Sequence, residues 1–349
     1  MEPFSERNPR SRRRERLETE AVLIDQMTTP SEAVRAAVAA LDGPVVLLGV
    51  GGKMGPTLAE LFVRAGARQV IGVSRFSDVD SRAYLDRIGV QTIQADMMVP
   101  SALDVLPDAP FVYFLAGFKF GATGAESATW TMNSFLPGLV MERYKSSKIV
   151  YVSSGNVYAY VYTESQGATE TGELGPVGEY AQSRLGGERI AQYFSSVNRT
   201  PLVIVRLFYA TELRYGILHD LAWKIRQGEP IALEMGFANQ IWQGDANAYL
   251  TRLIPFCDSP PTIINMTGPA ILSVRNLAER LGALMGTEPL FRGTESPTAL
   301  LGDATKLIGE LGEPGLSIDQ MLEWVAHWVN QGGRSLGKPT KFESRTGKF

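Results

Sequence analysis

The sequence predicts an α/β fold in which a doubly wound parallel sheet is joined to a smaller C-terminal lobe. From residue 43 onward, short apolar runs alternate with glycine-containing turns and amphipathic segments, which is typical of repeated βα units. A parallel sheet of this kind is covered by helices on both faces. The 349 residues are 44% hydrophobic and 20% charged, which allows a core of ordinary size.

The first helices and strands can be predicted from the glycines and prolines that separate them. A leading helix is expected just after Pro30, and Asp42-Gly43-Pro44 ends it. Six apolar runs then predict six strands. These strands are expected at 45–50, 69–74, 90–95, 111–116, 148–154 and 201–208. Helical segments are expected between them at about 56–65, 127–144 and 178–195.

Beyond residue 208 the alternation loosens, and residues 209–250 are rich in Gly, Pro and polar side chains. A later strand is expected at 262–267, and amphipathic helices at 274–286 and 317–329. The last residues show neither a helical nor a strand period, so they form either a tail or an arm lying on a neighbouring subunit. The predicted division is a tail and leading helix over 1–42, a dinucleotide-type sheet domain over 43–208, a mixed substrate-binding lobe with segments returning to the sheet over 209–330, and a tail over 331–349.

Composition excludes several classes of site. Cys257 is the only cysteine and His219 and His327 are the only histidines, so we expect no disulfide, no metal site and no histidine-based triad. The net charge of −3 does not point to nucleic acid or to an anionic membrane. No run approaches about 20 apolar residues, and the start of the chain lacks an apolar signal region, so a cytoplasmic protein is expected. The basic run at residues 12–16 is interpreted as a solvated tail or a partner contact.

A glycine-rich turn follows the first predicted strand directly. Its sequence is Gly49-Val50-Gly51-Gly52-Lys53-Met54-Gly55, and a helix is expected after it. Glycines let the backbone approach a pyrophosphate, and the helix N-terminus supplies unpaired N–H groups with positive potential. Glycines also serve tight turns for structural reasons alone. The strand before and the helix after favour a phosphate-binding loop of the Rossmann type, with Lys53 adding positive charge near a 2′-phosphate on the adenosine ribose.

The end of the second strand reads the adenosine ribose in such folds. This chain has Ser74-Arg75 there, with no acid before Asp78. Arginine suits a 2′-phosphate, which favours NADP over NAD as the cofactor. The alternative is that Arg75 is an ordinary surface arginine.

A serine and a tyrosine are the candidate catalytic residues. Ser154 ends the fifth predicted strand, and Tyr180 opens a helix about 26 residues later, with Arg184 at i+4 on the same helix face. A phenol beside a cation exchanges protons more readily, because the cation favours the phenolate. A serine hydroxyl can hold the substrate oxygen in place. Each feature also occurs by chance; their order after a glycine loop favours catalysis.

Together these residues resemble the extended short-chain dehydrogenase/reductase family, in its NAD(P)-dependent epimerase/dehydratase branch, which includes UDP-galactose 4-epimerase. The resemblance covers about residues 45–329. It implies Ser154 and Tyr180 as catalytic residues, with Arg184 in the place of the family's lysine. It also implies further cofactor contacts along the cleft. These are Asp96, Met97, Leu115, Ala116, Gly117, Lys119, Asn133 and Phe208, together with Tyr180 and Arg184 themselves.

Three departures limit what the resemblance implies about activity. Arg184 keeps the charge of lysine but stays protonated, so it is no proton relay. Tyr209 stands where the nucleotide-sugar epimerases carry Asn, and residues 238–242 lack their diphosphate-binding arginine. A free sugar, a sugar acid or another small polyol therefore fits at least as well as a UDP-sugar.

The expected function is an NAD(P)-dependent epimerase or oxidoreductase that acts on a sugar-like carbinol or carbonyl. Epimerase and reductase stay open, whereas Gly155-Asn156 after the serine argues against a dehydratase. The alternative is a regulatory or scaffold protein that binds NADP without turnover, which the change of lysine to Arg184 motivates. The resemblance also implies a homodimer formed through the helices at 127–144 and 178–195.

Overall fold

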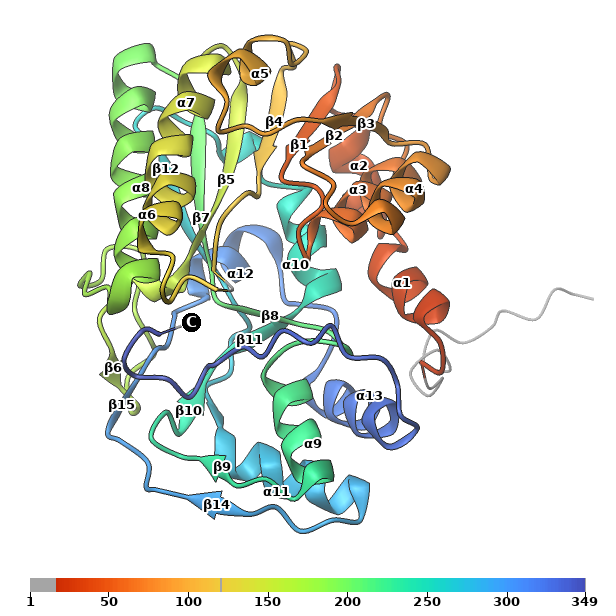
Figure 1. Cartoon of the computed structure of the whole chain (residues 1–349), viewed down its shortest axis with the longest axis vertical. Helices are drawn as coiled ribbons and strands as arrows, with labels where there is room; N and C mark the ends of the chain where they lie inside the picture. Colours follow the sequence, from red (N-terminus) through yellow and green to blue (C-terminus); the bar gives the residue numbers. More distant parts are fainter. Residues whose placement is uncertain (1–16, 120, 349) are drawn as a thin grey trace, which may run out of the picture.

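The computed structural model describes residues 17–119 and 121–348 and contains a seven-stranded sheet (Figure 1). The strand order is β12-β7-β5-β4-β1-β2-β3, and every pair in this sheet is parallel. The chain therefore starts in the middle of the sheet and winds outward in both directions, as the doubly wound prediction requires. The strands are β1 (Val45–Leu48), β2 (Val70–Ser74), β3 (Gln91–Gln94), β4 (Phe111–Phe114), β5 (Lys148–Ser154), β7 (Leu202–Leu207) and β12 (Thr262–Met266).

Successive side chains of a strand point to opposite faces, so each apolar strand serves two layers of helices. In β1, Val45 and Leu47 join one core cluster, and Val46 and Leu48 join the other. The first face is covered by α2 (Glu32–Ala39), α3 (Gly55–Arg64), α4 (Val79–Arg87), α10 (Gln243–Leu250) and α12 (Thr305–Leu311). The second carries α5 (Pro100–Asp104), α6 (Glu126–Trp130), the π-helical turn η2 (Thr131–Phe135), α7 (Leu136–Arg143) and α8 (Gly178–Asn198).

A second hydrophobic core forms the lobe below the carboxyl edge of the sheet (Figure 1). Its helices are α1 (Glu20–Thr28), α9 (Ile217–Gln227), α11 (Val274–Met285) and α13 (Ile318–Asn330). Short strands pair around it: β8 (Tyr209–Thr211) with β11 (Gln240–Trp242), β10 (Phe237–Ala238) with β13 (Leu272–Ser273), β9 (Ile231–Ala232) with β14 (Phe291–Arg292), and β6 (Val161–Tyr162) with β15 (Thr298–Ala299). The 3₁₀ turns are η3 (Gly155–Val157) and η4 (Ile254–Phe256).

The two ends of the chain differ from expectation. No element was expected over residues 17–28, yet they include α1, whose Leu23 and Met27 are buried in the lobe core. Residues 331–348 were expected as a tail or as an arm on a neighbouring subunit, but they run back between this chain's own sheet and lobe (Figure 1), and Phe342 is buried in the lobe core. The basic run at residues 12–16 lies outside the described residues. None of the helices described is long and apolar enough to cross a membrane.

Candidate active site

Two adjoining cavities lie at the carboxyl edge of the parallel sheet. Gly49, Gly52, Leu115 and Gly117 line both of them, so they form one continuous cleft. One cavity extends toward the ends of β2 and β3, and the other toward α8 and the lobe. A cleft at this edge, beside the point where the strand order reverses, is where open α/β sheets bind ligands.

The glycine turn is built so that no side chain fills the cleft. Gly49 has φ +88°, and a Cβ atom there would lie 2.7 Å from the backbone nitrogen of Ala116. Gly55 opens α3, and a Cβ atom there would lie 2.1 Å from the carbonyl oxygen of Val50. The turn therefore tolerates only glycine at both positions, and it leaves the N-terminus of α3 close to the cleft. These residues fit an anionic phosphate group.

The cavity toward β2 and β3 contains the residues expected at the adenosine end. Ser74, Arg75, Asp96 and Met97 all line it. Arg75 is exposed there. Asp78, the first acid after the strand, instead accepts a hydrogen bond from the backbone N–H of Asp80 and caps α4. Arg75 is thus the charged side chain that the end of β2 contributes to this cavity.

The other cavity brings the two candidate catalytic residues together. Ser154 and Tyr180 both line it, on β5 and in the first turn of α8. The Ser154 hydroxyl donates to Oδ1 of Asn156 at 3.2 Å and accepts from the backbone N–H of Asn156 at the same distance. Asn156, which sequence reasoning passed over, thereby orients the serine and lines the cavity itself.

Arg184 lies one turn after Tyr180 and is only 3% exposed. Its guanidinium donates to the carbonyl oxygens of Ala116, at 3.4 Å, and Val152. It also stacks 5.2 Å from the centroid of the Tyr151 ring. The arginine therefore ties the ends of β4 and β5 to α8, while Nε lacks a hydrogen-bond partner within the described residues.

Asn133 is fully buried in the π-helical turn and does not line the cleft. Its amide nitrogen donates to Phe118 O at 2.9 Å and Ser183 Oγ at 3.0 Å, and its oxygen accepts from the Phe118 N–H at 2.8 Å. The Asn133 side chain thus holds the loop after β4 against α8 from the buried side of that loop. A direct cofactor contact by Asn133 stays a prediction.

Two lysines stand in the cavity of Tyr180. Lys53 was expected near the adenosine phosphate, but its ammonium donates to Ala210 O at 2.6 Å and lies 4.4 Å from the centroid of the Tyr215 ring. Desolvation lowers the pKa of Lys53 to about 7. Lys119 Nζ lies 5.7 Å from the ring centroids of both Tyr180 and Tyr209, and burial lowers its pKa to about 8. Sequence reasoning expected the cation beside Tyr180 to be Arg184; Lys119 is a second one.

The remaining expected cofactor contacts lie along the same cleft. Those lining one or both cavities are Gly51, Met54, Ala116 and Phe208, in addition to the residues already named. Tyr209 and Tyr215 line the cavity of Tyr180 as well; the sequence marked Tyr209 as a departure from the nucleotide-sugar epimerases, and no motif marked Tyr215. Within the described residues, no group of three or more His, Cys, Asp or Glu could hold a metal ion.

A buried ion pair beneath the site escaped the sequence analysis. Arg206 on β7 is 1% exposed, and its guanidinium lies 2.8 Å from the carboxylate of Glu188 on α8, which is fully buried. The same carboxylate accepts the Ser153 hydroxyl at 2.6 Å, and Arg206 donates to the Tyr158 hydroxyl at 2.8 Å. The sequence does contain a signal for this ion pair, because Arg206 interrupts the apolar run of a predicted strand.

Comparison with known families supports the same interpretation. Residues 45–213 match the model of the NAD dependent epimerase/dehydratase family. This match spans the sheet from β1 to β7 and includes the glycine turn, Ser154 and Tyr180. A search of curated protein sequences found no match.

Several solved structures share the fold. UDP-glucuronic acid 4-epimerase from Bacillus cereus, in complex with NAD, has a TM-score of 0.69 at 19% identity and covers 82% of this chain and 99% of its own. UDP-glucose 4-epimerase from Thermotoga maritima, with UDP-glucose, has a TM-score of 0.69 at 16% identity and covers 83% and 99%. A short-chain dehydrogenase/reductase superfamily protein from Agrobacterium tumefaciens, with bound NAD, has a TM-score of 0.71 at 17% identity and covers 83% and 98%.

At these identities the neighbours show the fold, and the family match adds the domain type. The predicted Rossmann-type sheet and the resemblance to the extended short-chain dehydrogenase/reductase family are both confirmed. Residues 45–213 of this chain are thus similar to the NAD dependent epimerase/dehydratase family, and the rest of the chain shares the fold of the neighbouring structures.

Proposed function

We propose that the protein is an NAD(P)-dependent epimerase or oxidoreductase acting on the carbinol or carbonyl of a sugar or sugar derivative. The observation that carries the proposal is that Ser154, Tyr180 and Lys119 line the same cavity, which joins the glycine turn. When bound, the nicotinamide ring supplies a hydride acceptor or donor. The protein must then move a proton on the neighbouring oxygen.

Tyr180 is the proposed proton carrier. As the phenolate, Tyr180 would accept the proton of the substrate hydroxyl while the carbon gives up hydride, and the phenol so formed would return the proton when hydride comes back. The Ser154 hydroxyl holds the same oxygen, and the Lys119 ammonium, 5.7 Å from the centroid of the Tyr180 ring, adds positive charge to this cavity. Arg184 acts through the backbone, because its hydrogen bonds to Ala116 O and Val152 O hold the cavity walls.

An absorbance assay separates epimerase from oxidoreductase. The chain is incubated with NADP or NAD and a panel of free sugars, sugar acids, polyols and UDP-sugars, and the reduced nicotinamide is followed. Net reduction or oxidation identifies an oxidoreductase. Inversion detected by NMR without net absorbance change identifies an epimerase. Turnover in neither assay, with tight dinucleotide binding, overturns the proposed enzyme.

That last result would establish the second candidate, a dinucleotide-binding regulatory or scaffold protein. The observation in its favour is Arg184, whose guanidinium is engaged by backbone carbonyls and stays protonated. Restoring lysine at position 184 tests it further. If Arg184→Lys gains turnover on the panel, the chain has retained the rest of the machinery.

The proposed cofactor preference is NADP, and Arg75→Gln tests it. Loss of a charge-assisted contact to the 2′-phosphate is expected to weaken NADP binding by about 10- to 100-fold and to leave NAD binding unchanged. Calorimetric titration of both dinucleotides measures this. Arg68→Gln is the matched control, because Arg68 donates to Asp42 O at the opposite edge of the sheet. Equal weakening of both cofactors would contradict the preference.

Dinucleotide binding is expected to depend on pH through Lys53. Burial lowers the pKa of Lys53 to about 7, with Glu212 opposing this and Arg214 and Lys119 adding to it. A bound pyrophosphate raises the lysine pKa again, so affinity is full below pH 7 and falls as the pH rises above it. The dinucleotide Kd, measured from pH 6 to 8.5, should increase by about tenfold as the lysine loses its proton. Lys53→Met should bind the dinucleotide more weakly at pH 6, and its Kd should no longer change with pH. The same pH dependence of Kd in the variant would exclude Lys53 as its source.

The proposal includes a homodimer formed through α7 and α8. An apolar groove there is lined by side chains of η2, α7 and α8. Phe135 and Tyr193 are 56% and 63% exposed on it, an unusual state for large apolar rings in a monomer. Phe135→Glu is expected to convert a dimer into a monomer in light-scattering measurements. Val105→Glu, which charges an exposed site elsewhere, should leave the mass unchanged. A wild-type monomer would contradict the dimer.

A further inference from the structure

Residues 338–348, here called the arm, cross the cleft between the sheet and the lobe (Figure 1). They have no helix or strand, and the residues they contact are distant in the sequence. Thr340 donates from its backbone N–H and its hydroxyl to Asp220 Oδ2 on α9, at 2.7 and 2.6 Å. Lys224, one turn further along α9, pairs with Glu343 at 2.8 Å.

The arm is anchored more firmly beyond Glu343. Arg345 donates to the backbone oxygen of Thr298 at 2.7 Å and to its hydroxyl at 2.8 Å, and its guanidinium lies 4.4 Å from the centroid of the Tyr160 ring. The arm then meets the start of α8. A Cβ atom on Gly347 would lie 2.1 Å from Val177 O, so the backbones are in direct contact three residues before Tyr180.

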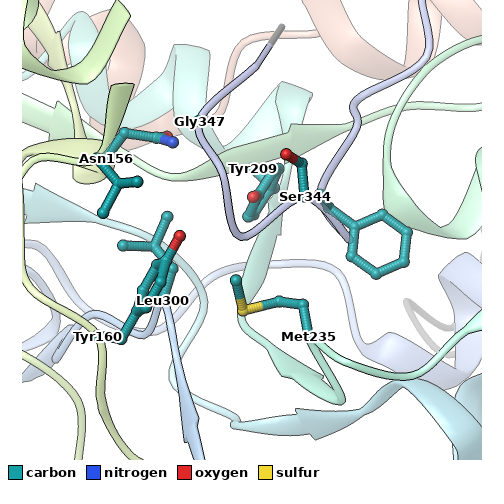
Figure 2. A pocket seen from close by; sticks show the side chains of 9 residues that line it. Asn156, Tyr160, Tyr209, Met235, Leu300, Ser344 and Gly347 are labelled. Carbon is teal, nitrogen blue, oxygen red and sulfur yellow. The ribbon is translucent and has the colours of Figure 1, made fainter. Parts of the chain in front are cut away.

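Beneath the arm lies a small pocket, shown in Figure 2 with the arm passing beside it. The arm contributes Phe342, Ser344 and Gly347 to its lining. Asn156 and Tyr209 line both this pocket and the cavity of Tyr180, so the pocket adjoins that cavity. The pocket holds about 10 Å³ of free space, against about 200 Å³ in the adjoining cavity.

The chemistry of this pocket is neutral. Its lining offers hydroxyl and amide groups from Asn156, Tyr160, Tyr209 and Ser344, and no lysine or arginine belongs to the described lining. A diphosphate needs cations or many N–H donors, whereas a hydroxylated carbon skeleton needs groups such as these. The space, close to that of one water molecule, admits no nucleotide.

We propose that the arm determines specificity by closing the substrate end of the cleft, so that the substrate is a small polyhydroxylated carbinol or carbonyl compound without a nucleotide. The proposal rests on the proposed function for the location of the reacting carbon. The anchors at Asp220, Thr298 and Val177 hold the arm in place, and a larger substituent on the substrate would meet Phe342 and Ser344.

Two variants test the arm, and binding is measured rather than turnover. The first ends the chain after Gly337, and the second is Arg345→Met, which keeps side-chain bulk but removes the Thr298 hydrogen bonds. Arg292→Met, an exposed arginine of the same lobe, is the matched control. Calorimetry with UDP-glucose and with a panel of free sugars is carried out with and without saturating dinucleotide. Tryptic cleavage after Lys341 reports whether Arg345→Met loosens the arm.

The full chain and Arg292→Met are expected to bind a free sugar and to exclude UDP-glucose. At least one arm variant should gain UDP-glucose affinity by about tenfold or more, since about 1.4 kcal/mol corresponds to each factor of ten. UDP-glucose binding equally to all forms, or to none of them, overturns the proposal. A full chain that binds a free sugar and dinucleotide but turns over nothing would instead overturn the proposed enzyme and leave the arm's role supported.

Discussion

Phenylalanine in place of Tyr180 is expected to lower turnover by about 10²- to 10⁴-fold, the usual contribution of a positioned proton carrier. The ring of the variant keeps its packing, because Tyr180 is 9% exposed and packs with Ala122 and Phe118. Dinucleotide affinity should change by less than about threefold, since the loss falls on the transition state alone. Initial rates and calorimetric Kd values for the same preparation measure both.

The control for this experiment is Tyr193→Phe. Tyr193 lies more than three turns further along the same helix and lines the groove of the proposed dimer instead of the cavity of Tyr180, so its hydroxyl has no role in proton transfer. A second comparison is Lys119→Met, which should lower turnover and remove the part of the pH profile that follows an amine with a pKa of about 8. Unchanged turnover in Tyr180→Phe would exclude the phenol as the acid and base.

The sequence predicts those site residues whose positions depend on the conformation of the neighbouring backbone. Gly49 and Gly55 are readable because a Cβ atom at either position would collide with backbone of the same turn or of the loop after β4. Ser154 and Tyr180 are readable because a strand end and a helix start set their positions along the cleft edge. The match of residues 45–213 to one family agrees with how far these local patterns extend.

The strand pairings within the lobe and the path of the arm were not predictable, because partners distant in the sequence determine them. β8 pairs with β11, which begins 31 residues after β8 begins, and each strand is three residues long and has no readable period. The arm has no regular element, and Arg345 bonds to Thr298 across 47 residues. Similarly, the direction of Lys53 depends on Ala210 O, 157 residues away, so the glycine motif alone could not predict that its ammonium lies in the cavity of Tyr180.

Breaking the buried ion pair beneath the site is expected to cost about 3–5 kcal/mol of the free energy of unfolding. In Glu188→Leu, the Arg206 guanidinium stays in a site where it is 1% exposed, without its carboxylate. The Ser153 hydroxyl also loses its acceptor. Urea denaturation of the wild type and the variant measures the difference. Glu310→Leu, at an exposed position of α12, is the control expected to change stability by less than about 0.5 kcal/mol.

The double variant Glu188→Leu with Arg206→Met separates the pair from simple packing. Removing both charges leaves no buried ion, so about as much stability should return as the single variant lost, because matched apolar residues replace buried pairs at little cost. The Tyr158 hydroxyl keeps Asn265 Oδ1 as its partner at 2.7 Å. If the double variant is as unstable as Glu188→Leu, the lost free energy of unfolding comes from altered side-chain packing and not from an unpaired buried charge. The ion pair would then serve to orient β5 and α8 rather than to stabilise the fold. Because Ser153 adjoins Ser154 and Glu188 lies two turns after Tyr180, that outcome should also appear as a loss of turnover in the double variant.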